Sequence, residues 1–252
     1  MKIICTGLDP AGLYLACLLK AGDRANDVTI VEAGDAAARA PHIMRHPLKP
    51  AWSLADAPLA RAIDAAGRVV DGVRIRSTQC DISTEGQSYA FIAAAALRDI
   101  LLTRARELGC RIGGADMGGA DLVIVADGEK SAFRAAHAQD FGTSLAPSKT
   151  LHALFDVDLA SKKFEFWFRR TPHGIVHAML MPSGAASTLY VETTDAVATK
   201  AGLGQADTAD IAHFCDEVFA EELEGRTLFP RGECCVAFEE VGADLGGHAS
   251  GH

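Results

Sequence analysis

The first 32 residues constrain the fold most, because they read as a strand, a glycine turn, a helix and a second strand in that order. The run Ile3–Cys5 is short and apolar, as in a buried strand. The apolar segment 11–20 is followed by Gly22, a residue that suits the end of a helix. Residues 28–31 form the next apolar run, and Glu32 closes it. This order predicts a nucleotide-binding fold of the α/β class.

The turn after the first strand has most of the residues that a pyrophosphate site needs. Gly7 and Gly12 bracket it, and Pro10 and Ala11 lie between them. Such a turn aims backbone N–H groups and the positive end of a helix at phosphates. Glu32 comes about 20 residues later, where an acidic side chain accepts hydrogen bonds from a ribose. We therefore expect the adenosine half of a dinucleotide to lie here.

One residue departs from the Gly-x-Gly-x-x-Gly pattern. Asp9 occupies the position of the middle glycine, which normally lets the backbone approach the phosphates. Its carboxylate adds bulk and negative charge where the ligand is most negative. The motif thus indicates the fold and leaves open whether a pyrophosphate is bound or only the strand, turn and helix are inherited.

Composition excludes several classes of protein. A chain of 252 residues with 49% hydrophobic residues is long enough for one large or two modest domains. Its net charge of −9 and the absence of a basic run argue against nucleic acid or an anionic membrane as a partner. We find no signal-peptide pattern, and the longest apolar segment, 11–19, is too short to span a bilayer. The seven cysteines lack metal-ligand spacing, so we expect reduced thiols, no metal site and a cytoplasmic location.

The middle of the chain alternates irregular and regular segments. Residues 33–58 are rich in Ala, Pro and His and predict a long loop, in which His42, Arg45 and His46 are either contacts for a ligand phosphate or solvated loop residues. The pattern then predicts a helix over 59–66, a strand over 69–77, a helix over 92–108 and a short strand over 110–112. Residues 121–126, DLVIVA, form a continuous apolar run typical of a central parallel strand.

The pattern changes near residue 150. Four strand candidates, 151–157, 163–169, 175–181 and 188–192, are separated by turn signals, which favours an antiparallel sheet. In KFEFWFR, Phe164, Phe166 and Phe168 face one side and Glu165, Trp167 and Arg169 the other. This aromatic stripe either floors a pocket for a planar substrate or packs on the sheet's own core. Residues 207–223 predict an amphipathic helix, and the Gly-rich segment 230–252 predicts a flexible tail.

Several of these segments together resemble a known family. The stretches GLDPAGLYLA, VTIVE, DLVIVADGEKSAFR and FGTSL are similar to the class A flavoprotein monooxygenases, the family of p-hydroxybenzoate hydroxylase. STLYVETTDAVATKAGL and FCDEVFAEELEGRTL resemble the branch that holds the violacein-pathway hydroxylase and the salicylyl-CoA and 2-aminobenzoyl-CoA hydroxylases. The most specific match is the motif Asp-Gly-x-x-Ser-x-x-Arg, complete in Asp127, Gly128, Ser131 and Arg134. The alternative reading of this motif is a stabilising turn with an Asp cap.

The resemblance implies a Rossmann-like FAD/NAD(P)-binding domain over 1–149, an inserted antiparallel β-sheet substrate domain over 150–229, and the tail. It implies that NAD(P)H reduces FAD and that oxygen is delivered to an aromatic acid, an aryl-CoA or an indole-type substrate. It assigns cofactor binding to the residues named above, Gly7, Pro10, Ala11, Gly12, Glu32, Asp127, Gly128, Ser131 and Arg134. No catalytic residue is assigned, because the flavin carries the reaction and the protein supplies a dry, shaped pocket.

The chain also departs from this branch. Ala-Pro-His-Ile-Met at 40–44 replaces a Gly-Trp-Gly-Val-Val-like segment, and 93–96 are alanines where the branch often has an Arg or Lys. The Gly-Asp motif that contacts the flavin in the family would lie beyond residue 252. Two functions therefore stay open: a flavin-dependent aromatic hydroxylase, or a flavin-poor, non-catalytic paralogue acting as a binding or accessory subunit. For either we expect a homodimer or pairing with an active homologue.

Overall fold

The computed structural model describes residues 1–32, 40–47, 55–114, 119–128, 131–141, 143–183, 186–231 and 236–243. The chain divides into two compact units. Unit 1 comprises Met1–Ala36, Arg98–Pro147 and Glu239–His252, and unit 2 comprises Ala37–Leu97 and Ser148–Phe238. No helix in the described ranges is both long and apolar enough to cross a membrane.

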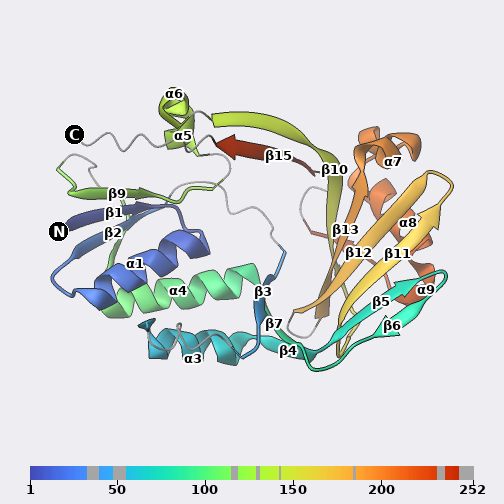
Figure 1. Cartoon of the computed structure of the whole chain (residues 1–252), viewed down its shortest axis with the longest axis horizontal. Helices are drawn as coiled ribbons and strands as arrows, with labels where there is room; N and C mark the ends of the chain where they lie inside the picture. The colour runs from blue at the N-terminus through green and yellow to red at the C-terminus, as the bar shows by residue number, and fades with distance from the viewer. Residues whose placement is uncertain are drawn as a thin grey trace. The chain divides into compact units, whose positions relative to one another are not determined.

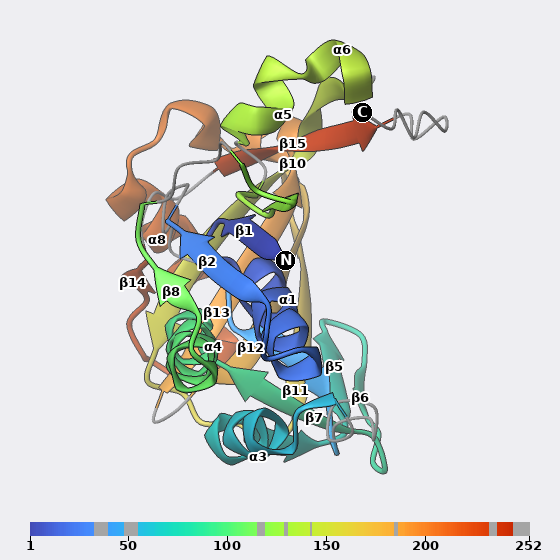
Figure 2. The same cartoon turned by 90° about the vertical axis from the view of Figure 1, so that its left-hand side faces the viewer.

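Unit 1 is built on a four-stranded parallel sheet in the order β8-β2-β1-β9, in which β9, β1 and β2 are labelled in Figure 1 and β8, β2 and β1 in Figure 2. The strands are β1 (Lys2–Thr6), β2 (Asp27–Val31), β8 (Arg111–Ile112) and β9 (Leu122–Val125). Helices α1 (Pro10–Gly22) and α4 (Ala94–Leu108) lie side by side, and the buried Cys17 thiol of α1 is 3.6 Å from the Leu101 carbonyl oxygen of α4. This confirms the predicted parallel α/β arrangement.

The position predicted for strand 121–126 is wrong in one respect. Within the described residues β9 is at the end of the strand order, and β1 has the central place between β2 and β9. Leu122 is exposed and the other residues of β9 are half-buried, whereas Ile3, Ile4 and Cys5 of β1 are fully buried. An apolar run indicates a strand, but which strands pair with it depends on distant segments.

The segment after β9 contains two short helices and a long strand. Helices α5 (Ala132–Ala136) and α6 (Ala138–Phe141) precede β10 (Thr143–Val157), which begins in unit 1 and continues into unit 2. Strand β15 (Val236–Ala243) pairs with β10, where the sequence predicted a flexible tail over 230–252. Backbone hydrogen bonds in a ladder hold such a segment although its composition favours a loop. Cys234 and Cys235 lie outside the described residues.

Unit 2 contains the antiparallel sheet that the sequence predicted. Its strands follow the order β14-β10-β13-β12-β11-β5-β6. The bounds are β5 (Val73–Ser77), β6 (Asp81–Ser83), β11 (Phe164–Thr171), β12 (Gly174–Ser183), β13 (Ala186–Thr194) and β14 (Phe229–Pro230). One pairing is parallel, because β5 lies beside β11 with Val73 opposite Phe164. This pairing brings residues 37–97 into unit 2, although the sequence assigned them to a domain over 1–149.

A second, smaller sheet in unit 2 has the order β3-β7-β4, with β3 (His42–Arg45), β4 (Arg68–Asp71) and β7 (Ser88–Ile92). Helix α3 (Ala57–Ala66) precedes β4, and the Asp56 side chain accepts a hydrogen bond from Leu59 N at its start. The predicted strand 69–77 is divided into β4 and β5 at Gly72, which has φ of +85°. A β-carbon on residue 72 would be 1.9 Å from the Thr84 carbonyl oxygen, so this turn requires a glycine.

The two faces of the large sheet pack differently. One face is covered by α7 (Asp195–Lys200), α8 (Thr208–Val218) and α9 (Ala220–Leu223), and Trp167, Phe155 and Phe219 are fully buried in its core. The predicted helix 207–223 is therefore divided at Phe219, and the Asp207 side chain caps α8 by accepting from Asp210 N. The other face contacts the small sheet at one end, where Phe164 packs edge-on against Tyr89 and Phe91.

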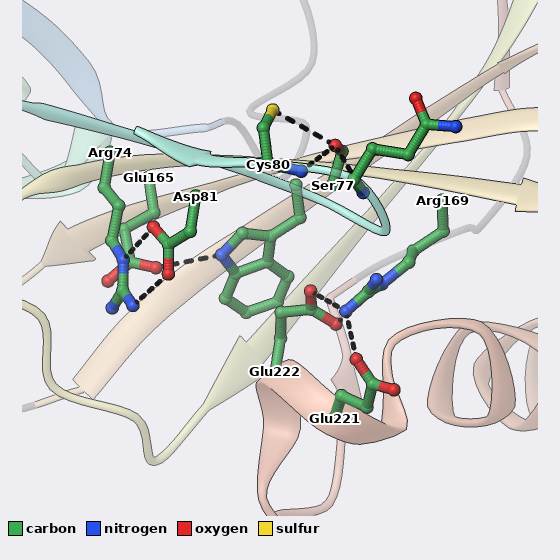
Figure 3. A network of polar contacts seen from close by, with 10 residues as sticks. Arg74, Ser77, Cys80, Asp81, Glu165, Arg169, Glu221 and Glu222 are labelled. Carbon is green, nitrogen blue, oxygen red and sulfur yellow. Dashed lines mark hydrogen bonds and ion pairs between the residues drawn. The ribbon is translucent and has the colours of Figure 1, made fainter. Parts of the chain in front are cut away.

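Two buried carboxylates lie under the helix-covered face. Glu222 of α9 is 1% exposed and forms an ion pair with Arg169 of β11, which also binds Glu221 at 2.6 Å (Figure 3). Glu165 accepts hydrogen bonds from Ser161 Oγ at 2.6 Å and from Trp167 Nε1 at 3.0 Å. Both carboxylates have partners for their oxygens, as buried charges require. They have a structural role between the sheet and the surrounding segments.

Candidate functional site

The turn after β1 has a backbone that only glycine can adopt. Gly7 has φ of +100°, and a β-carbon at this position would be 2.0 Å from the Ala126 carbonyl oxygen. Gly7 N donates to the Val31 carbonyl at 2.9 Å, and Ala126 N donates to the Thr6 carbonyl at 2.9 Å. The ends of β1, β2 and β9 are thereby held together around one glycine.

Gly12 allows helix α1 to lie close to the end of β9. A β-carbon on Gly12 would be 2.8 Å from the Ala126 side chain, so the glycine permits close packing of α1 on the end of β9. Pro10 is in the first turn of α1, where a missing backbone N–H costs no hydrogen bond, and Ala11 follows it exposed. The backbone therefore has the close approach that a pyrophosphate turn requires.

Asp9 is the N-cap residue of α1. Its backbone is extended, with φ of −68° and ψ of 147°, and its carbonyl accepts from Leu13 N at 3.1 Å. Its side chain makes no capping hydrogen bond to the helix. The half-buried carboxylate therefore lies at the positive end of α1, the place that a phosphate would take.

Glu32 lies at the exposed end of β2, directly after Val31, whose carbonyl accepts from Gly7 N. The predicted ribose-binding residue is thus beside the turn. Thr6, the last residue of β1, has a buried hydroxyl with no hydrogen-bond partner in the described part of the structure. A buried polar group next to this turn fits a site that binds a polar ligand.

The described residues of the Asp-Gly-x-x-Ser-x-x-Arg motif lie close together after the end of β9. Ser131 is buried and caps α5 by accepting from Arg134 N at 3.0 Å, and Arg134 Nη1 donates to the Gly128 carbonyl at 3.1 Å. The cap is therefore Ser131 and not an Asp as in the alternative reading. The Asp127 α-carbon would be 3.0 Å from a β-carbon on Gly7, so the structure brings this motif against the β1 turn.

Other candidates from the sequence lie in unit 2. His42 and Arg45 belong to β3, and His46 Nδ1 is 3.7 Å from Asp64 of α3. The structure thus gives His46 a carboxylate neighbour in its own unit. In the aromatic stripe, Phe164 belongs to the core between the two sheets, which is the second reading given above, whereas Phe168 is 38% exposed.

A row of polar residues on the large sheet was not predicted. It crosses the face opposite α7–α9, which we call the open face, and strand register places His152 opposite Glu192, Glu192 opposite His177, and His177 opposite Phe168. Tyr190 and Glu192 are two residues apart in STLYVETT, which indicates that both side chains are on one face of a strand. The sequence could not show which strands pair with it.

The polar row is linked by hydrogen bonds. The Tyr190 hydroxyl bonds His152 Nδ1 and is 3.4 Å from Glu192 Oε2, and His152 Nε2 is 3.0 Å from Thr150 Oγ1. Burial lowers the pKa of His152, although the Glu192 carboxylate 3.6 Å away acts in the opposite direction. Burial and Glu192 raise the pKa of Tyr190 above its ordinary range. Both side chains are therefore neutral at neutral pH.

Comparison with known proteins decides the fold family. No family model matches the chain. A Salicyloyl-CoA 5-hydroxylase from Streptomyces sp. is 29% identical over 234 residues, which are 89% of this chain and 45% of that protein. The chain thus spans less than half the length of this curated relative.

Solved structures agree with the sequence comparison. A variant of 2-methyl-3-hydroxypyridine-5-carboxylic acid oxygenase superposes with a TM-score of 0.68 at 18% identity, covering 96% of this chain and 71% of that chain. The probable FAD-dependent monooxygenase pqsL from Pseudomonas aeruginosa gives a TM-score of 0.64 at 15% identity, covering 92% and 73%. The chain has the fold of the class A flavoprotein monooxygenases. The resemblance read from the sequence motifs is confirmed.

In this fold, the turns described above lie together at one end of the parallel sheet. The pieces predicted to bind the cofactor, the Gly7 turn, Glu32 and the motif from Asp127 to Arg134, meet at the carboxyl ends of β1, β2 and β9. Ligands of open α/β sheets bind at this end of the strands. The backbone geometry fits a dinucleotide, and the Asp9 side chain at the N-terminus of α1 is acidic where the phosphates would lie.

Proposed function

We propose that this protein is an FAD-dependent, NAD(P)H-using monooxygenase that hydroxylates an aromatic substrate. The observation that carries the proposal is the convergence of three sequence motifs on the carboxyl ends of β1, β2 and β9 in a chain with the class A fold. The expected substrate is an aromatic acid, an aryl-CoA or an indole-type compound, and the likeness to Salicyloyl-CoA 5-hydroxylase supports the aryl-CoA.

The residues of unit 1 would hold the adenosine half of FAD. Gly7 and Gly12 leave the room in which backbone N–H groups can face the pyrophosphate, with Pro10 and Ala11 in the first turn of α1. Glu32 would accept hydrogen bonds from the ribose. Asp127, Gly128, Ser131 and Arg134 would form the adjoining wall, because Ser131 and Arg134 fix the shape of that turn.

The flavin, when bound, supplies the oxygen-transfer chemistry, and NAD(P)H supplies its electrons. The protein's part is to bind both, to orient the aromatic ring and to exclude water. We expect the same chain to work in the cytoplasm and to self-associate or pair with an active homologue. A tetrameric form of 2-methyl-3-hydroxypyridine-5-carboxylic acid oxygenase, which has a TM-score of 0.67 to this chain, supports self-association.

The decisive experiment is the absorbance spectrum of the purified protein. We expect the visible bands of oxidised flavin to remain with the protein through gel filtration, either as purified or after incubation with micromolar FAD. NADH or NADPH with the aromatic substrate should then bleach these bands and consume oxygen. A colourless protein that takes up no added FAD would refute the hydroxylase and favour the accessory subunit.

A substitution at Asp9 tests the cofactor site itself. Asp9→Gly removes a carboxylate from the N-terminus of α1, so FAD should bind at least tenfold more tightly, which corresponds to about 1.4 kcal/mol. The measurement is a fluorescence titration of FAD into the apoprotein. Asp23→Gly makes the same change at the other end of α1 and should leave the affinity unaltered. An equal affinity for Asp9→Gly and wild type would show that Asp9 does not weaken the site.

A further inference from the structure

The open face of the large sheet has an unusual composition for a solvated face. Antiparallel sheets commonly turn one face to the core and a polar face to water. Here the helix-covered face forms a core, and one end of the open face packs on the small sheet, where the half-buried Phe166, Met179 and Tyr190 contact a second core. The open face nevertheless exposes other large apolar side chains: Phe168 is 38% exposed, Ile75 38% and Ile175 55%. Exposed apolar side chains that gather on one face are typical of a binding surface.

Strand register arranges this face in rows. The apolar row runs Leu154, Tyr190, Met179, Phe166 and Ile75, each opposite the next on the neighbouring strand. The polar row is adjacent and runs His152, Glu192, His177 and Phe168. The rings of Phe168 and His177 stack with centroids 5.5 Å apart. A planar ligand lying on the apolar row would therefore have its edge against hydrogen-bonding groups.

The charge of the polar row is negative. The row contains the acidic side chain of Glu192, and its neighbour His152 is neutral at neutral pH because burial lowers the pKa of the imidazole. Among the side chains that the structure describes, no Arg or Lys forms an ion pair with Glu192. The polar row therefore presents hydrogen-bond acceptors and the acidic side chain of Glu192 to a ligand.

The arginines nearby do not offset this charge. Arg169 points to the opposite face of the sheet, where Glu221 and Glu222 neutralise it (Figure 3). Arg231 forms an ion pair with Asp156 through its Nη2 at 2.5 Å. Arg170 is exposed in the next row, opposite Ile175, where solvent screens its charge.

We propose that the open face binds an uncharged aromatic ligand that donates an N–H to the polar row, and that Glu192 rejects free aromatic carboxylates. The inference rests on the proposed function and excludes, among its three substrate classes, the free aromatic acid. The apolar row with Phe166 and Met179 contacts the ring. Glu192 accepts the hydrogen bond and sets the preference for an uncharged ligand, because a second carboxylate beside it would be repelled.

The test compares two fluorescent probes of almost the same shape. 2-Aminobenzamide is neutral and 2-aminobenzoate is an anion, and both carry an aromatic N–H donor. Titration into the purified full chain should show that the amide binds at least tenfold more tightly, a difference of about 1.4 kcal/mol. Glu192→Gln should reduce this ratio at least fivefold, mainly by strengthening 2-aminobenzoate binding. Glu217→Gln, a matched change at an exposed site on α8, should leave the ratio unchanged.

A salt titration of the wild type gives a second measurement that needs no variant. Added NaCl should strengthen 2-aminobenzoate binding and leave 2-aminobenzamide binding nearly constant, because salt screens repulsion between charges. The proposal is overturned if the anion binds as tightly as the amide, if neither probe binds, or if both Glu192→Gln and salt leave the ratio unaltered. The probes need no flavin, so their result is distinct from the absorbance test of the proposed function.

Discussion

Single residues decide where charge is buried and where it is presented. Arg169 and Glu192 are both on strands of the large sheet, yet their side chains are on opposite faces because of the two-residue period of a strand. Arg169 is neutralised by Glu221 and Glu222, whereas Glu192 has neutral His152 and Tyr190 as neighbours. The same sheet thus has one face where an arginine is neutralised in the core and one face that we propose binds a ligand.

His152 gives a pH dependence whose sign follows from its environment. Its pKa is lowered below 6.5 by burial, so the unfolded chain binds the proton more readily than the folded protein. The contribution of neutral His152 to the free energy of unfolding is complete above about pH 6.5. It is lost as the pH falls through the folded pKa, at up to about 1.4 kcal/mol per pH unit. We expect His152→Gln to remove this part of the slope in urea unfolding measured between about pH 7 and 5.

The control for this measurement is His213→Gln, because the His213 side chain is 76% exposed. Its unfolding free energy should follow the wild-type pH dependence. A wild-type protein that gains stability on acidification relative to His152→Gln would mean that Glu192 raises the pKa of His152 above its ordinary value.

At the scale of elements, the β1 turn and α1 are fixed by the space available to glycine. Gly7 and Gly12 are both in contact with Ala126 at the end of β9, so one strand end determines how close the turn and the helix can lie. Gly22 at the other end of α1 has no atom within 4 Å of an added β-carbon. The two ends of one helix therefore differ in their tolerance of a side chain.

Gly7→Ala tests this difference. The added methyl group would meet the Ala126 carbonyl at 2.0 Å and require φ near +100°, so we expect a loss of about 3 kcal/mol or more in the free energy of unfolding. FAD affinity should fall with it. Gly22→Ala is the matched control and should stabilise the protein by about 0.5–1 kcal/mol, because alanine favours the helix. Equal stability of the two variants in thermal and urea unfolding would contradict the assigned geometry.

At the scale of the whole molecule, pairings between distant segments organise the chain. Strand β5 lies beside β11 although about 90 residues separate them, and Arg169 meets Glu222 across 53 positions of sequence. The pairing of β5 with β11 joins residues 37–97 to the other part of unit 2. The ion pair between Arg169 and Glu222 joins the sheet to the helices that cover it.

Arg169→Met tests the ion pair between Arg169 and Glu222. It leaves the Glu222 carboxylate buried without its arginine, so the free energy of unfolding should fall by about 3–5 kcal/mol. The double variant Arg169→Met/Glu222→Gln should recover part of the loss, since no buried charge remains. Arg74→Met breaks a more exposed pair with Asp81 and should cost less than about 1 kcal/mol. Equal losses for Arg74→Met and Arg169→Met would show that burial does not decide the outcome.

Local patterns were sufficient for much of unit 1. The spacing of glycines and apolar residues predicted β1, α1 and β2, and the resemblance motifs identified the turn from Asp127 to Arg134. These features could be read from sequence because they depend on residues close together in the chain. The place of β9 at the end of the strand order, as the described residues have it, and the break at Phe219 could not, since both depend on contacts made by distant segments.

By itself the sequence determined the α/β class, the four antiparallel strands after residue 150 and the likeness to the class A fold, because hydrophobic period and glycine position are local properties. Only the tertiary structure decided that the motifs meet at Ala126 and that His152, Glu192, His177 and Phe168 form one row. The physical reason is strand register: period-two alternation gives each residue a face, but hydrogen bonding between strands chooses its neighbours.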